Sequence, residues 1–355
     1  MPGFKLPILP TSVVGSHGRP GWLYLFREAA QGRELGSVDI REVEDDAVRL
    51  AILDQEEAGI DVITDGEMRR TSGYYRGYMD RILNLPLSKK PPLRQLGPIH
   101  YDFTRLRQVV GPISAPDGLG IVDEFKYLKA RTKKPVKATC AGPLNFAREC
   151  IPGSRYKSTF DLAYDFAKII NAELKGLAAA GAEFIQVDEP SYVHLKEEPE
   201  EMAKLFNATV EGVRAKVALH ICFGTHAGRP RMSRRTYRQL FPKILEAKVE
   251  QFVLEFANRQ MAEIELWKEF AVDREIGLGV VDVKAYEIES PEDVAERIRA
   301  ALKHIPAEKL WINPDCGMGN TPRWICVGKL KAMVEGTRIV RRELGFKESD
   351  DSSQS

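Results

Sequence analysis

The chain of 355 residues is 43% hydrophobic and can bury a large core, in two domains or in one α/β barrel. Its 52 basic and 51 acidic residues leave a formal net charge of +1, so overall charge gives no reason to expect binding to nucleic acid or to a membrane surface. The segment MPGFKLPILP is too short and too proline-rich for a signal peptide, and no apolar run approaches the roughly 20 residues that span a bilayer. Cysteines without tight pairing fit reduced thiols, so a cytoplasmic location is expected.

Short apolar runs alternate with amphipathic segments along the whole chain. Strands are expected at 12–14, 61–64, 135–139, 184–187, 217–221, 251–254, 276–281 and 310–312. Helices are expected at 43–58, 121–132, 159–180, 198–214, 234–247, 261–270, 291–303 and 322–343. Residues 84–120, rich in Pro and Gly, are expected to form an insertion with a hairpin after the second strand, and the polar residues 346–355 a disordered tail.

This alternation predicts an α/β fold with parallel strands and right-handed crossovers. Eight strand–helix repeats in a chain of this length favour a single closed (β/α)8 barrel over residues 1–345. An open doubly wound sheet is the alternative. No G-x-G-x-x-G motif follows a strand, so a dinucleotide-binding fold has no support.

Polar side chains stand where the expected strands end. They are Ser16, Asp65, Glu67, Cys140, Asp188, Glu189, His220, Cys222, Glu255, Asp282, Asp315 and Cys316. Ordinary turns need none of these types, and a barrel gathers the carboxyl ends of its strands on one rim. The pattern therefore predicts one polar pocket on that rim.

His220 and Cys222 suggest a metal site within this pocket. They are two residues apart at the end of the fifth strand and so face the same side. Glu255 follows the sixth strand and Cys316 the eighth, so a barrel would bring all four side chains together. Imidazole, thiolate and carboxylate are zinc ligands, and sulfur ligation favours zinc over magnesium or calcium. Cys140, after the third strand, is a spare ligand candidate.

Each of these residues alone has a simpler interpretation. A free cysteine is often a small buried apolar side chain, a histidine at a strand end is usually just hydrogen-bonded, and Glu255 can be a salt-bridge partner. Cys150 and Cys326 fall in helical or loop segments and are expected to be ordinary buried cysteines. The zinc prediction depends on the joint pattern, because the ligand types coincide at the same end of successive strands.

Several motifs together resemble the catalytic barrel of the cobalamin-independent methionine synthase family, over about residues 12–335. They are GSH at 15–17, TDGE at 64–67, QVDEP at 186–190, HIC at 220–222, LEFAN at 254–258, GVVDV at 279–283 and NPDCG at 313–317. The resemblance implies methyl transfer to the thiol of homocysteine. It also implies one zinc ion per chain, with the ligands His220, Cys222, Glu255 and Cys316, and homocysteine bound by Ser16, Glu67 and Asp188. Two carboxylates suit the ammonium group of homocysteine.

The sequence departs from the family pattern at three places. The length leaves no room for the second, amino-terminal barrel of the folate enzyme. No Trp follows the turn in CAGPLNFAREC, residues 140–150, where the family has a Trp that stacks on the folate pterin. The family's YDIHS segment is Val281–Ala285 here, with Lys284 in place of a His that the family uses as a proton donor. Asp282 and Lys284 are therefore the candidate catalytic residues.

The last two departures favour methylcobalamin or a methylated corrinoid protein as the methyl donor. A methyl group leaves folate only after its nitrogen is protonated, whereas a methyl group on cobalt leaves without a proton. A corrinoid protein is thus an expected partner, beside homocysteine or a similar small thiol.

Two other functions stay open on the sequence. One is thiol alkyl transfer of the epoxyalkane:coenzyme M transferase kind, in which cations such as Arg69, Arg70 and Arg76 would bind a sulfonate, although Glu67 and Asp188 favour an amino acid. The other is a non-catalytic zinc-binding or chaperone-like barrel.

Overall fold

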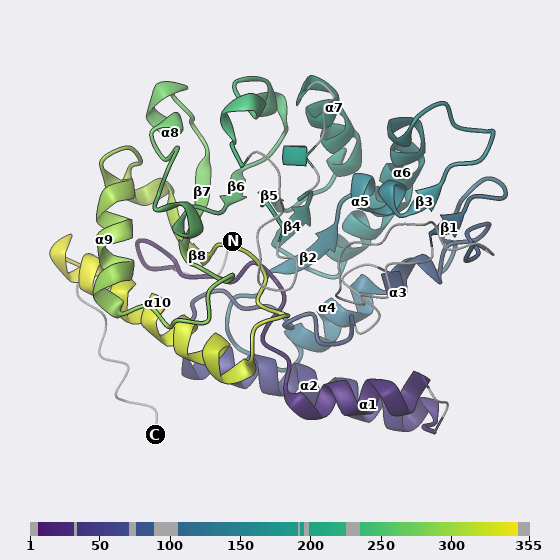
Figure 1. The fold of residues 1–355 in the computed structure, drawn as a ribbon, viewed down its shortest axis with the longest axis horizontal. Coiled ribbons are helices and arrows are strands. Elements are labelled where there is room, and N and C mark those ends of the chain that lie inside the picture. The colour runs from purple at the N-terminus through teal and green to yellow at the C-terminus, as the bar shows by residue number, and fades with distance from the viewer. Residues whose placement is uncertain are drawn as a thin grey trace.

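The computed structural model of the chain describes residues 6–31, 34–70, 76–88, 106–190, 192–194, 199–224 and 235–346. Its centre is a sheet of six parallel strands in the order β2, β4, β5, β6, β7, β8 (Figure 1). Their bounds are β2 Ala138–Ala141, β4 Phe184–Asp188, β5 Lys216–Ile221, β6 Gln251–Leu254, β7 Glu275–Val281 and β8 Leu310–Pro314. Because neighbours in the sheet are also neighbours along the chain, the strand ends meet in sequence order.

Two further segments, around residues 11–12 and 62–63, close the sheet into a ring between β8 and β2. Parallel bridges join Thr11 to Ile312, Ser12 to Val62 and Ile63 to Val136. The first two expected strands are thus reduced to single bridges, but they lie in the expected places. The prediction of an α/β fold with a ring of parallel strands is confirmed.

Burial on both faces explains the continuous apolar runs in the strands. All residues of β2, β4, β6 and β8 are buried, as parallel strands covered by helices require. A small apolar cluster, separate from the larger core, is formed by side chains from the strand segments: Val14, Val62, Phe184, Ala218, Val253 and Trp311. The larger core lies between the sheet and the helices.

The longer helices cover the outside of the sheet (Figure 1). They are α2 Ser37–Glu57, α4 Ile121–Lys129, α6 Thr159–Ala179, α7 Pro199–Val210, α9 Pro291–Leu302 and α10 Arg323–Glu343. Their starts follow ordinary capping chemistry. Ser158 accepts a hydrogen bond from the backbone of Asp161 before α6, and Ser290 accepts one from Asp293 before α9, where Pro291 takes the first helical position. These six helices confirm the helices expected in the same regions.

Two of the helices predicted after the fifth strand are not formed as expected in the described residues. Instead of a helix over 234–247, the chain forms short 3-10 turns at Arg238–Leu240 and Lys243–Glu246, because Pro242 between them lacks the N–H group that a helix needs. The helix expected at 261–270 shrinks to α8, Leu266–Glu269. Positive φ angles of 52°, 64° and 71° at Gln260, Met261 and Glu263 exclude a helix before it.

Among the residues that the structure describes, three α-helices were not expected: α1 Gly21–Gln31, α3 Arg76–Met79 and α5 Pro143–Arg148. In α1 the side chains of Trp22, Tyr24 and Leu25 are exposed, so the apolar pattern of this segment does not show its buried face.

The segment 84–120 is described only in part, because residues 89–105 lie outside the described ranges. Antiparallel bridges join Leu83 to Ser114 and Leu87 to Arg107, and the short strand β1, Arg107–Gln108, pairs with β3, Cys150–Ile151. The expected tail at 346–355 also lies outside the described residues, apart from Phe346. Within the described ranges, no helix is both long and apolar enough to cross a membrane.

Candidate active site

Three of the predicted zinc ligands come together at the end of the barrel strands. His220 and Cys222 lie at and just after the end of β5, and Cys316 follows β8. One ligand atom from each lies within 4.8 Å of the other two, and the two sulfur atoms are 3.3 Å apart. Their hydrogen bond lets the pair share a proton: it raises the pKa of Cys222 and, together with His220, lowers the pKa of Cys316. The set of one nitrogen and two sulfur atoms is typical of a zinc site.

His220 is oriented for this cluster by Asp188, at the end of β4. Nδ1 of His220 lies 2.8 Å from Oδ1 of Asp188. The other ring nitrogen, Nε2, is buried and has no hydrogen-bond partner in the described part of the chain. A buried imidazole nitrogen without a partner fits a metal ligand, and a carboxylate on the opposite nitrogen is the usual support for one.

Behind Asp188 a chain of hydrogen bonds continues into the barrel interior. The amide nitrogen of Gln186 donates to Oδ1 of Asp188 at 2.6 Å, and Nζ of Lys137 donates to the amide oxygen of Gln186 at 2.6 Å. Lys137 is 1% exposed, and burial lowers its pKa to about 7 although Asp188 acts in the opposite direction. Neither Gln186 nor Lys137 was expected as a site residue. The sequence feature that could have indicated them is Lys137 itself, a charged residue within an otherwise apolar expected strand.

Glu255, the fourth predicted ligand, is paired with Lys284. Nζ of Lys284 lies 2.7 Å from both carboxylate oxygens, and both side chains are almost completely buried. One oxygen also accepts a hydrogen bond from the backbone N–H of Phe223, at 3.1 Å. The metal-binding group in the described residues is therefore His220, Cys222 and Cys316, and Glu255 stands beside it with a cation of its own.

Asp282 and Asp315 both hold loops at this end of the barrel. Asp282 accepts hydrogen bonds from the backbone of Lys284 at 2.8 Å and from the side chain of Asn258 at 2.9 Å. The buried carboxylate of Asp315 accepts from the backbone N–H groups of Phe256, Ala257 and Asn258 at 2.7–2.9 Å. These bonds fix the turns that carry Glu255 and Lys284.

Ser16 and Glu67 lie in the loops after the first two strand positions. Oγ of Ser16 accepts a hydrogen bond from the backbone of Gly319 at 3.2 Å. Oε1 of Glu67 is 2.8 Å from the guanidinium of Arg70 and accepts from Thr139 at 3.0 Å. Burial raises the pKa of Glu67 to about 7, although Arg70 acts to lower it.

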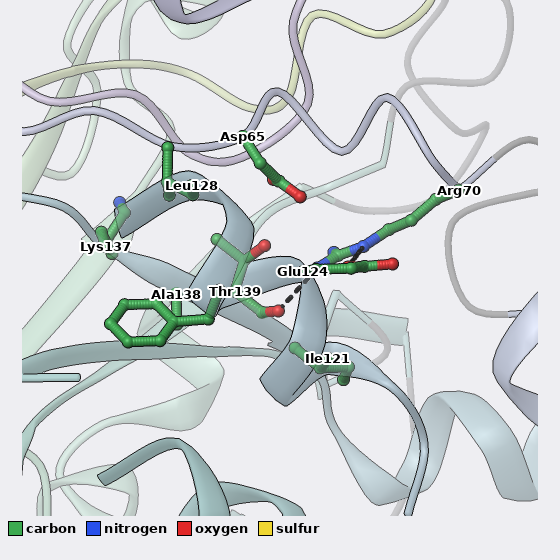
Figure 2. Close-up of a pocket in the computed structure, with 9 residues that line it drawn as sticks. Asp65, Arg70, Ile121, Glu124, Leu128, Lys137, Ala138 and Thr139 are labelled. Carbon is green, nitrogen blue, oxygen red and sulfur yellow. Dashed lines mark hydrogen bonds and ion pairs between the residues drawn. The ribbon is translucent and has the colours of Figure 1, made fainter. Parts of the chain in front are cut away.

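Arg70 also lines a small pocket, together with Asp65, Glu124 and Thr139 among other residues (Figure 2). Arg70 donates to the backbone oxygen of Thr139 at 2.8 Å and lies 3.4 Å from Glu124, which in turn accepts from the hydroxyl of Tyr78 at 2.7 Å. The positive charge of Arg70 is thus balanced by Glu67 and Glu124.

The remaining cysteines lie outside the metal-binding group. Cys140, the expected spare ligand, is buried and its sulfur lies 3.4 Å from the backbone oxygen of Ala141. Cys326 lies 3.3 Å from Nδ1 of His17, whose Nε2 lies 2.8 Å from Asp54. These contacts join the first loop of the barrel to α2 and α10.

Comparison with known proteins agrees with this geometry. A family model described as "Cobalamin-independent synthase, Catalytic domain" matches residues 9–338. The "Methionine synthase" of Sulfurisphaera tokodaii is 38% identical over 356 residues, which cover 98% of this chain and 97% of the relative. That of Saccharolobus solfataricus is also 38% identical, over 96% of this chain and 97% of the relative.

A solved structure supports the same assignment. The B12-independent methionine synthase from Shewanella sp. W3-18-1, in complex with selenomethionine, superposes with a TM-score of 0.80 at 29% identity, over 95% of this chain and 99% of that chain. Both the sequence and the fold are therefore shared over nearly their full lengths. This chain belongs to the cobalamin-independent methionine synthase family, through its catalytic domain.

Proposed function

We propose that this chain transfers a methyl group to the thiol of homocysteine, at a zinc ion, and forms methionine. The observation that carries the proposal is the cluster of His220, Cys222 and Cys316, with a buried imidazole nitrogen that no protein group in the described residues satisfies. The names of the relatives, methionine synthases of similar length, support the same acceptor.

The three clustered side chains would hold the metal, with Glu255 as the fourth protein ligand. Zinc, when bound, supplies a Lewis acid that keeps the acceptor sulfur as a thiolate at neutral pH. Asp188 holds the imidazole of His220 in position through Nδ1. Lys284 neutralises Glu255 in the structure described here, so it would balance the charge of that carboxylate when the carboxylate is not a metal ligand.

The amino-acid part of homocysteine would bind at Ser16 and Glu67. The buried carboxylate of Glu67 suits an ammonium group. Asp188, assigned to the same ammonium on sequence, has its Oδ1 in bonds to His220 and Gln186. We therefore give Asp188 a double role, in which it orients His220 and contributes negative charge to the substrate end.

For the methyl donor we keep methylcobalamin or a methylated corrinoid protein. Residues 143–147, which follow the turn where the family places its stacking Trp, are all buried, and Phe146 packs on Phe166, so they offer no exposed aromatic face. Lys284 stands in place of the family's proton donor and is paired with Glu255. The family description, cobalamin-independent, favours the opposite donor class, so a direct assay must decide.

We also propose that residues 1–345 form a single catalytic barrel, with 84–120 as an insertion after the second strand position. The sulfonate-binding alternative receives less support. Arg69 is paired with Asp45 and Arg70 with Glu67 and Glu124, so neither is left for a sulfonate, while the side chain of Arg76 lies outside the described residues.

The test is methyl transfer to homocysteine by the purified zinc-loaded protein, with methylcobalamin and methyltetrahydrofolate assayed side by side. We expect methionine formation, about one zinc per chain, and loss of both zinc and activity in Cys316→Ser but not in Cys140→Ser. Full zinc and activity in Cys316→Ser would refute the ligand assignment. Activity with folate alone would refute the corrinoid donor, and coenzyme M as the better acceptor would refute homocysteine.

A further inference from the structure

We propose that Arg19 binds the carboxylate of the amino-acid acceptor and is a specificity residue of this site. The inference deepens the proposed function and rests on it, because it places the other charged end of homocysteine in the same pocket. Arg19 lies three residues after Ser16, outside the motifs that relate the chain to its family.

Arg19 is a half-buried cation with weak hydrogen-bond partners. Its Nη2 donates to the backbone oxygen of Arg70 at 3.2 Å, and its Nη1 lies 3.5 Å from the backbone oxygen of Gly319. Its Nε is buried and makes no hydrogen bond in the described part of the chain, where no carboxylate forms an ion pair with it. A guanidinium presents a fork of donors that matches a carboxylate, and burying it without an opposite charge is unfavourable.

The neighbouring arginines differ in this respect. Arg69 is paired with Asp45 and lies over the ring of Tyr127, and Arg70 is paired with Glu67. Arg19 therefore has a positive charge available for a ligand, whereas the charge of each neighbour is already balanced.

Gly319 brings Arg19 and Ser16 to one place, because its backbone approaches both side chains closely. A Cβ atom on Gly319 would lie 3.2 Å from Oγ of Ser16 and 3.3 Å from Nη1 of Arg19, which is a tight contact with both. A hydroxyl and a guanidinium thus lie on the same side of Gly319. A substrate carboxylate beside them would accept hydrogen bonds from both groups.

Ser16 and Arg19 lie beside the metal-binding group. A Cβ on Gly317, the residue after Cys316, would strike Oγ of Ser16 at 2.2 Å, so the hydroxyl of Ser16 lies next to the loop that carries the metal-binding cysteine. Glu67 lies close enough to Arg19 for their charges to interact. An amino acid with its sulfur near Cys316 would present its ammonium to Glu67 and its carboxylate to Arg19, so the two protein charges complement a zwitterion.

The test compares two acceptors that differ only in the carboxylate. Aminopropanethiol is homocysteine without that group. In Arg19→Gln we expect kcat/KM for homocysteine to fall roughly 10- to 100-fold, as for a lost charged hydrogen bond, with little change for aminopropanethiol. Arg69→Gln is the matched control and should change neither value. Equal losses for both acceptors in Arg19→Gln would overturn the proposal, because they would indicate only a structural role.

Binding provides a readout that does not depend on methyl transfer. Calorimetric titration with L-methionine should show weaker binding to Arg19→Gln than to the unmodified protein, and the decarboxylated analogue methylthiopropylamine should bind both alike. If the unmodified protein transfers no methyl group but its methionine affinity depends on Arg19, the proposed reaction fails and this inference stands. If transfer occurs and Arg19→Gln keeps full methionine affinity, the inference fails and the proposed function stands.

Two further variants test whether a loss of affinity in Arg19→Gln comes from misfolding. Arg19→Lys keeps the charge but loses the fork and should recover part of the methionine affinity. Gly319→Ala keeps the charge of Arg19 but places a methyl group in tight contact with both Arg19 and Ser16, so it should weaken methionine binding without weakening methylthiopropylamine binding. Unchanged methionine affinity in Gly319→Ala, with thermal unfolding like that of the unmodified protein, would contradict the position assigned to the carboxylate.

Discussion

Asp188 and His220 are joined by a 2.8 Å contact between Oδ1 and Nδ1, and the opposite imidazole nitrogen, Nε2, is left without a hydrogen-bond partner in the described residues. The two residues come from neighbouring strands and are direct partners in the register of β4 and β5. The orientation of a proposed zinc ligand is thus set by the pairing of two strands and not by the HIC motif alone.

Replacing Asp188 by Asn should weaken zinc binding. The amide keeps the size of the side chain but removes the charge that orients and polarises His220, and losses of about 10- to 100-fold in metal affinity are typical for such changes. Competition with a chromophoric chelator measures the affinity. The exposed Asp273, paired with Lys309, gives the matched variant Asp273→Asn, which should bind zinc normally. Zinc affinity in Asp188→Asn equal to that of the control would contradict this role.

Gln186→Leu should destabilise the protein by about 1–3 kcal/mol, because it leaves buried polar groups unpaired at both ends of the amide. Lys137 would lose its side-chain acceptor and Asp188 a donor. Urea unfolding measures the loss. The control is Gln239→Leu, at an exposed residue whose amide donates to one backbone oxygen. The double variant Lys137→Met with Gln186→Leu should be less destabilised than the sum of the two single variants. Strict additivity would show that the two side chains do not act as a unit.

Lys284→Met separates the structural role of this lysine from a role as proton donor. Glu255 would be left buried without its cation, which typically costs about 3–5 kcal/mol of folding stability. With zinc bound, that cost should shrink, since the metal can take over the charge of Glu255. If the donor is a corrinoid, which needs no proton, the folded variant should keep methyl transfer from methylcobalamin. Loss of that activity at full zinc content would assign Lys284 a direct part in the chemistry.

His17 should make stability depend on pH in the alkaline range. Burial acts to lower its pKa, but Cys326 and Asp54 outweigh this and raise the pKa from 6.5 to about 9. Because the folded-state pKa is above the unfolded one, the contribution is fully present below about pH 6.5 and is lost as the pH rises through about 9. It amounts to at most about 3 kcal/mol. Urea unfolding between pH 6.5 and 9.5 should show a larger decline for the unmodified protein than for His17→Gln, with His304→Gln as the control. Parallel declines in all three proteins would refute the prediction.

The order of the strands and the position of the metal-binding group followed from local patterns. Apolar runs buried on both faces, each ending in a polar residue, were sufficient to predict the ring of strands, because the carboxyl ends of parallel strands meet on one side. His220 and Cys222 had to face the same way, since side chains alternate along a strand. Local pattern failed after β5, where turns replace the expected helices because of Pro242 and the positive φ angles at Gln260, Met261 and Glu263.

What the sequence by itself determined, then, is the repeating fold and the residues that stand on its rim. Only the tertiary structure decided which rim residues touch: Glu255 pairs with Lys284, Asp188 with His220 and Glu67 with Arg70, while Arg19 keeps its charge unpaired in the described part of the chain. The physical reason is that a hydrogen bond or an ion pair forms or fails with a change of a few tenths of an ångström in the distance between donor and acceptor. Those distances are set by strand register and loop packing across the whole barrel, which no local pattern of residues records.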